Sequence, residues 1–220
     1  MAKRQADASA NFGVWFGCSL PSDFGNPEVE YRFAKQSVAL LDKNYRAYLS
    51  FTGPDRVRYL NAILTNNIKD LAVGQGIISL LLNPQGHILA ELETYAFADH
   101  HLCASYAMIR EQLIQWMDKY IIMDDVTLTD ETDRWGALAL EGPKAAAVAR
   151  EVSGVDLASQ DELSSVHGGV GAIPCRIVKR SPGDVRGAES LLNERSLRRS
   201  GKFCSTPRAN TAAAQQVIPR

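Results

Sequence analysis

The order of apolar and polar residues divides the first 180 positions into predicted helices and strands. Residues 28–42, EVEYRFAKQSVALLD, carry apolar side chains at helical spacing, which predicts a helix. Residues 12–27 combine turn residues with large aromatics and predict an extended arm. Two later apolar runs, AYLSF from Ala47 and ALALE from Ala137, predict strands, and each is followed by Gly-Pro and a helical pattern.

The backbone properties of glycine and proline explain why a Gly-Pro pair precedes each of the two predicted helices. Pro54 and Pro143 suit the first helical position, N1, because that position needs no N–H donor. Gly53 and Gly142 allow a sharp exit from the preceding strand. Asp55 places a negative charge in the first helical turn, where the helix dipole favours it. Two such units predict an α+β core in which both helices cover the same sheet system.

An antiparallel meander is predicted between these two units. Residues 77–82 form an apolar strand, and Asn83-Pro84-Gln85-Gly86 has the composition of a turn. The next strand, residues 87–97, alternates, so that Glu91 and Glu93 share one face and apolar residues occupy the other. The remaining prediction comprises a helix over 108–120 with Leu113, Trp116 and Met117 buried, and strands near 102–106, 126–128, 135–140 and 172–178.

The chain changes character after Arg180. Residues 181–220 have little apolar periodicity and many Arg, Ser, Ala and Pro residues, which predicts a disordered tail. A basic tail that binds RNA is the weaker alternative, because aromatic residues are nearly absent there. The predicted organisation is an N-terminal arm over 1–27, one domain over 28–180 and a tail over 181–220.

Composition and charge narrow the function classes. A formal net charge of −1 gives no reason to expect nucleic acid or an anionic membrane as the main partner. No apolar run approaches the roughly 18 residues of a transmembrane helix, so a cytoplasmic protein is predicted. The four cysteines, Cys18, Cys103, Cys175 and Cys204, are scattered like reduced thiols. The His100-His101 pair is interpreted as a surface turn, and no metal site is expected.

The run from Leu40 to Phe97 resembles the N-terminal part of the folate-binding superfamily of aminomethyltransferases (the glycine cleavage T-protein) and YgfZ proteins. The shared motifs are Leu-x-Asp, Gly-Pro-Asp, Leu-Thr-Asn, Gly-Gln-Gly and a Gly-centred hairpin, and ALALEGPKA matches the opening of a later helix. The similarity covers roughly residues 28–155. It implies an α+β fold of antiparallel sheets covered by helices, with a ferredoxin-like subarrangement, and tetrahydrofolate or another reduced folate as cofactor.

Two segments, FGCSLPSDFGNPEVEY and LIQWMDKYIIMDDVTLTD, resemble the YgfZ branch more than the aminomethyltransferases. That resemblance implies a tetrahydrofolate-binding protein for iron–sulfur cluster protein maintenance and tRNA modification, with iron–sulfur client proteins as partners. The alternative is a divergent aminomethyltransferase that passes a one-carbon unit to tetrahydrofolate, so enzymatic activity stays open. A third alternative is a fragment that keeps part of the fold without the function.

The C-terminal motifs of both branches are absent after Val178. The domain is therefore expected to be incomplete, and the hypothesis is that the coding frame shifts near Ser181.

The resemblance also implies site residues. Glu91 occupies the place of the catalytic Asp of aminomethyltransferases, and its extra methylene argues against efficient transfer. Ile78 and Tyr106 correspond to a Tyr and an Asn of the folate pocket, and Tyr106 can stack on a pterin. Asn66-Asn67 replaces an Asn-Asp pair, so Asn67 is a candidate folate contact, although capping of the helix is the favoured role. A solvated strand face is the alternative for Glu91 and Glu93, and an ordinary strand-end aromatic is the alternative for Tyr106.

Overall fold

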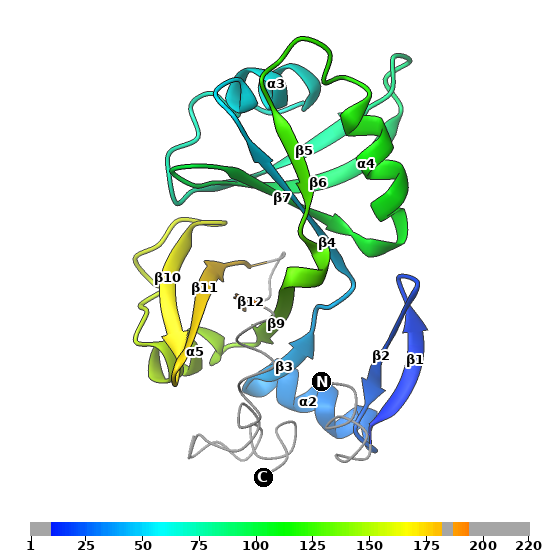
Figure 1. Cartoon of the computed structure of the whole chain (residues 1–220). Helices are drawn as coiled ribbons and strands as arrows, with labels where there is room; N and C mark the ends of the chain where they lie inside the picture. The colour runs from blue at the N-terminus through cyan, green and yellow to red at the C-terminus, as the bar shows by residue number, and fades with distance from the viewer. Residues whose placement is uncertain (1–9, 182–186, 194–220) are drawn as a thin grey trace. The chain divides into compact units, whose positions relative to one another are not determined.

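The computed structural model describes residues 10–181 and the backbone of residues 187–193 (Figure 1). The chain divides into two compact units, which are treated separately below. Unit 2 contains Tyr45–Asp133 and Leu163–Ser165. Unit 1 contains the other described residues. No helix in the described part of the chain is long and apolar enough to span a membrane.

Unit 2 is a five-stranded antiparallel sheet with two helices. Its sheet has the order β5-β6-β7-β4-β8. Without the edge strand β5, this is the βαββαβ arrangement of a ferredoxin-like fold, as the family resemblance implied. The elements are β4 (Arg46–Thr52), α3 (Arg56–Ile63), β5 (Gly76–Leu82), β6 (Ile88–Ala96), β7 (His101–Tyr106), a 3-10 turn (Ala107–Ile109), α4 (Arg110–Asp118) and β8 (Thr127–Asp130).

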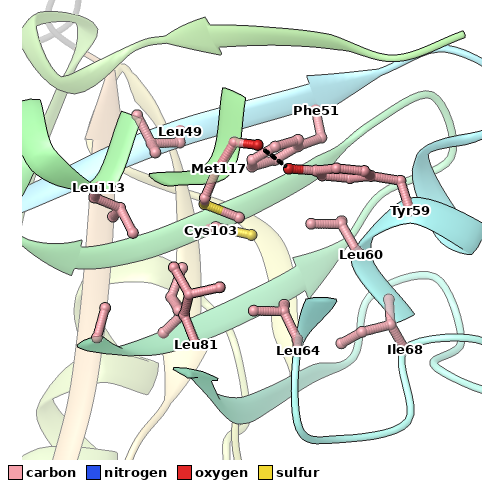
Figure 2. Packing of buried hydrophobic residues seen from close by; sticks show 12 residues of the cluster. Leu49, Phe51, Tyr59, Leu60, Leu64, Ile68, Leu81, Cys103, Leu113 and Met117 are labelled. Carbon is pink, nitrogen blue, oxygen red and sulfur yellow. Dashed lines mark hydrogen bonds between the residues drawn. The ribbon is translucent and has the colours of Figure 1, made fainter. Parts of the chain in front are cut away.

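The hydrophobic core of unit 2 lies between one face of this sheet and the two helices (Figure 2). Leu60 of α3 and Leu113 and Met117 of α4 are completely buried there, as the predicted stripe on α4 required. Trp116 packs against the core but stays partly exposed. Tyr59 Oη donates a hydrogen bond of 2.6 Å to the Met117 carbonyl, so the two helices are joined by a buried polar contact as well as by packing.

Unit 1 contains a hairpin, two helices and a second five-stranded sheet of order β10-β11-β12-β9-β3. Asn26 caps its first helix by accepting a hydrogen bond from the Val29 N–H. The elements are β1 (Asn11–Trp15), β2 (Cys18–Asp23), α2 (Pro27–Gln36), β3 (Ala39–Asp42), β9 (Trp135–Glu141), α5 (Ala145–Ser153), β10 (Ser165–Val170), β11 (Ile173–Lys179) and β12 (Gly187–Asn193). A short 3-10 turn spans Thr132–Arg134, and the division between the units falls within it along the chain, after Asp133.

The prediction that both Gly-Pro helices cover one sheet system is wrong. Helix α3 packs on the sheet of unit 2, whereas α5 packs through Ala149 on Leu138 and Ile177 in unit 1. The helix predicted over 28–42 is also too long, because α2 ends at Gln36 and residues 39–42 pair with β9. Apolar spacing alone could not separate these residues, since a helix and a short buried strand use similar apolar runs.

The Gly-Pro pairs form turns before the helices and do not begin them. Helix α3 starts at Arg56 and α5 at Ala145, so the placement of both prolines at N1 is wrong. A hydrogen-bonded turn intervenes, with the Ala145 N–H donating to the Gly142 carbonyl at 3.0 Å. The prediction for the glycines is confirmed, because φ is +99° at Gly53 and +130° at Gly142.

Strand β12 lies in the region that the sequence analysis assigned to a tail. It pairs antiparallel with β11 on one side and with β9 on the other. Strand β10 was also missing from the predicted set. The domain boundary at residue 180 stays a prediction, and residues 194–220, most of the predicted tail, lie outside the described residues.

Candidate functional site

Three of the four predicted site residues lie on one face of the unit 2 sheet, in the adjacent strands β5, β6 and β7. Ala90 and Leu92 of β6 belong to the core under the helices. Because side chains alternate along a strand, Glu91 and Glu93 project from the opposite face. We call this opposite face, defined by Ile78, Glu91, Glu93, Tyr106 and Arg46, the polar sheet face.

The strand register brings these side chains close together. Ile78 is the direct partner of Glu93, and Glu93 is in turn the partner of Ala104 on β7. Two residues further along the same register, Tyr106 comes opposite Glu91, and Ser105 Oγ donates a 2.8 Å hydrogen bond to the Glu91 carbonyl. Ile78, Glu91 and Tyr106 thus share one surface: Tyr106 lies beside Glu91, and Ile78 lies on the diagonal from Glu91, whose direct partner on β5 is Leu80.

The two acidic residues of β6 have different environments. Glu91 is exposed, so the alternative of a solvated strand face describes its position, and the same exposure leaves its carboxylate accessible to a ligand. Glu93 is only 2% exposed, so the solvated-face alternative is wrong for it. Its Oε1 lies 2.9 Å from Arg46 Nη2, and its Oε2 accepts a 2.8 Å hydrogen bond from the Tyr95 hydroxyl.

Arg46 connects this buried ion pair to Tyr106. The two residues are direct partners in the β4–β7 register, and the guanidinium carbon lies 5.6 Å from the centre of the Tyr106 ring. The Tyr45 ring is stacked on Tyr106 at 6.1 Å and 12°. The sequence analysis missed Arg46 and Glu93 as a pair. The only signal was for Arg46, which is the one charged residue in the otherwise uncharged run RAYLSFT of β4.

Asn67 is not grouped with the other three residues by the contacts of the structure. It lies exposed in the loop after α3, where its amide donates to Asp70 Oδ2 at 2.6 Å. The neighbouring Asn66 donates its amide to the Ile78 carbonyl at 3.0 Å and so ties this loop to β5. These contacts agree with an ordering role for the Asn pair, and a folate contact by Asn67 stays a prediction.

The histidine pair differs from its predicted surface turn. His101 is the first residue of β7 and is 4% exposed. Burial lowers the pKa of His101 to about 4, and the positive charges of Arg56 and His100 act in the same direction. Among the described residues no group of three or more His, Cys, Asp or Glu side chains is arranged to hold a metal ion.

The polar sheet face can hold a flat, polar ring. Tyr106 offers an aromatic surface, Ile78 an apolar one that is 41% exposed, and Glu91 a carboxylate that accepts hydrogen bonds only. A heteroaromatic ligand with N–H groups along one edge matches this combination of stacking surface and acceptor.

The fold is that of a known family. Residues 1–181 match the family described as the GCVT N-terminal domain, and the chain belongs to it. Curated relatives carry the name aminomethyltransferase. The protein from Lysinibacillus sphaericus is 29% identical over 153 residues, covering 69% of this chain and 41% of the relative. A Staphylococcus epidermidis relative is 26% identical over 152 residues, covering 69% and 42%. The chain thus spans about two fifths of the length of these relatives.

Solved structures agree on the fold. The glycine cleavage system aminomethyltransferase T from Bartonella henselae superimposes with a TM-score of 0.76 at 21% identity, covering 86% of this chain and 52% of that one. The heterotetrameric sarcosine oxidase from Corynebacterium sp. U-96 gives a TM-score of 0.55 at 17% identity, covering 75% and 84%. The α+β fold class predicted from the sequence is confirmed. The relatives named here give no support for the YgfZ branch, which the sequence analysis preferred.

Proposed function

We propose that this chain is a tetrahydrofolate-binding, aminomethyltransferase-like module that takes part in the transfer of a one-carbon unit. The ligand lies on the polar sheet face, with Glu91, Tyr106 and Ile78 as contacts. The observation that carries the proposal is the convergence of these three residues from adjacent strands, in a member of the GCVT N-terminal domain family.

The residues present fit a reduced pterin. A reduced pterin carries several N–H donors, which suit the acceptor-only carboxylate of Glu91. Its planar pyrimidinone ring suits contact with the Tyr106 side chain, whose ring is stacked with that of Tyr45 at 6.1 Å. Bound tetrahydrofolate supplies a nucleophilic nitrogen that accepts the one-carbon unit.

Glu91 has an electrostatic part in this proposal. A carboxylate beside the reacting amine stabilises the positive charge that develops there as the carbon–nitrogen bond of the donor breaks. Its exposure makes this group accessible, but a water-filled surrounding weakens its field compared with a closed site. We therefore expect this chain to have only modest transfer activity.

A second candidate function is folate binding without transfer, in the manner of a YgfZ-like protein that serves iron–sulfur client proteins. The replacement of the family's catalytic Asp by the longer Glu91 favours it, since a displacement of about 1 Å can reduce a rate on the order of a hundredfold. Both candidates share the folate site and a cytoplasmic location, for which the scattered cysteines are suited.

Titration calorimetry of tetrahydrofolate into the full chain tests the proposal. We expect saturable one-to-one binding, which weakens in Tyr106→Leu and in Glu91→Gln. The matched control is Glu111→Gln, which changes an exposed glutamate on α4, on the helical side of the same sheet, and leaves the affinity unchanged. Absence of binding by the wild-type chain contradicts the proposal.

A second assay separates the two candidates. The chain is incubated with tetrahydrofolate and an aminomethyl donor, and methylenetetrahydrofolate is measured. Its formation, reduced in Glu91→Gln, supports transfer. Binding without any product supports the second candidate.

A further inference from the structure

We propose that Arg46 and Glu93 are positioning residues, which hold the ring of Tyr106 beside Glu91 and so prepare the polar sheet face for a flat ligand. This inference rests on the proposed function, because it concerns the same ligand site. It assigns a role to two residues that lie outside the ligand contacts named above.

Arg46 is well placed to fix Tyr106. It is 8% exposed and lies directly across the β4–β7 pair from Tyr106, with its guanidinium carbon 5.6 Å from the ring centre. A guanidinium at this distance is attracted to the electron-rich face of a tyrosine ring. The Ala107 N–H also donates to the Tyr45 carbonyl at 2.8 Å, which fixes the backbone on both sides of the aromatic pair.

Glu93 in turn fixes Arg46. Glu93 Oε1 forms an ion pair with Arg46 Nη2 at 2.9 Å, and the Tyr95 hydroxyl donates a 2.8 Å hydrogen bond to the other carboxylate oxygen. Tyr95 is itself held, because its ring lies against Gly76. A Cβ atom at Gly76 would come within 2.7 Å of the Tyr95 ring and 2.6 Å of the Leu163 carbonyl. A continuous series of contacts therefore runs from β5 through Glu93 and Arg46 to Tyr106.

Stability alone does not account for this arrangement. Burying a carboxylate and a guanidinium costs desolvation free energy that their attraction often fails to recover, and apolar replacements are frequently neutral or stabilising. The pair is buried on the sheet face that carries the candidate site, whereas the opposite face of the same sheet is packed with apolar residues. A role in positioning Tyr106 at the candidate site explains why a buried ion pair lies on this face.

The decisive variant removes both charges while keeping an acceptor for Tyr95. Arg46→Met combined with Glu93→Gln leaves a carbonyl oxygen that can accept from the Tyr95 hydroxyl. We expect a folded protein, with a melting temperature close to that of the wild type, in which tetrahydrofolate binds about fivefold more weakly because Tyr106 must be ordered on binding. The matched control is Lys43→Met with Glu141→Gln, which removes another partly buried ion pair, of 3.1 Å, in unit 1 and leaves the affinity unchanged.

A readout without ligand makes the test independent of folate binding. The ring resonances of Tyr106, assigned with Tyr106→Phe in ¹H–¹³C spectra, are expected to shift in the double variant, while those of Tyr59 on the opposite sheet face stay in place. If the double variant does not fold, Arg46→Lys provides the same comparison, because it keeps the charge but loses the planar guanidinium.

The possible results separate the two ideas. A folded double variant with unchanged affinity and unchanged Tyr106 resonances overturns the positioning role and leaves the proposed function intact. If the wild-type chain binds no tetrahydrofolate, the proposed function fails, and the Tyr106 resonances alone decide the positioning role: a shift supports it and no shift overturns it.

Discussion

Replacing Gly53 by Ala should destabilise the protein far more than replacing Gly86 by Ala, although both glycines have positive φ. Gly86 has φ of +82°, and nothing lies within 4 Å of where its Cβ would stand, so Gly86→Ala costs only backbone strain of about 1–2 kcal/mol. Gly53 has φ of +99°, and its Cβ would overlap the backbone carbonyl of Asp125.

The extra cost at Gly53 comes from the segment that must move. The Asp125 carbonyl accepts from the Asp55 N–H at 3.3 Å, and the Asp125 N–H donates to Asp55 Oδ2 at 2.9 Å. Displacing Asp125 weakens both bonds, which adds roughly 1–3 kcal/mol. We therefore expect Gly53→Ala to lower the free energy of unfolding by about 2–5 kcal/mol in total.

Urea unfolding followed by circular dichroism measures this difference. The two alanine variants are compared with the wild type at one temperature, and equal m-values confirm that the change lies in stability. If Gly53→Ala costs no more than Gly86→Ala, the close approach of Asp125 is not what requires glycine at position 53.

Two further predictions concern buried polar groups. Because burial lowers the pKa of His101 to about 4, the unfolded chain binds its proton more tightly; stability is therefore complete above about pH 6.5 and falls by up to roughly 3 kcal/mol as pH drops to about 4. In His101→Gln the part of this loss between pH 6.5 and 4 should disappear from urea-unfolding curves, and an unchanged pH dependence refutes the assignment. Tyr59→Phe removes the 2.6 Å hydrogen bond to Met117 and should cost about 1 kcal/mol, whereas Leu60→Ala in the same helix should cost about 2–5 kcal/mol. Equal losses in thermal or urea unfolding would show that the hydrogen bond contributes as much as the packing of Leu60, which refutes this ranking.

Much of unit 2 follows from local patterns. The alternation in residues 87–97 predicts β6 and its two faces, and Asn83-Pro84-Gln85-Gly86 predicts the turn in which the Gly86 N–H donates to the Asn83 carbonyl. The stripe Leu113, Trp116 and Met117 predicts the buried side of α4. These features depend on side-chain periodicity and on the conformational freedom of glycine, which are properties of short stretches of chain.

The resemblance over roughly residues 28–155 added the candidate residues Ile78, Glu91, Tyr106 and Asn67, and the family itself is confirmed. It could not show that the first three share one surface. That arrangement depends on the register of β5, β6 and β7, which pairs residues far apart in the chain.

Other features were decided by tertiary pairing alone. In the sequence Arg46 and Glu93 are 47 positions apart, in two different strands, and only the folded sheet brings them to 2.9 Å in a buried ion pair. The same holds for residues 39–42, which become a strand because β9 lies beside them, and for α3 and α5, which cover different sheets. Local periodicity indicates which side of a helix or strand is apolar. The free energy that selects the neighbouring element comes from non-local burial and hydrogen bonding.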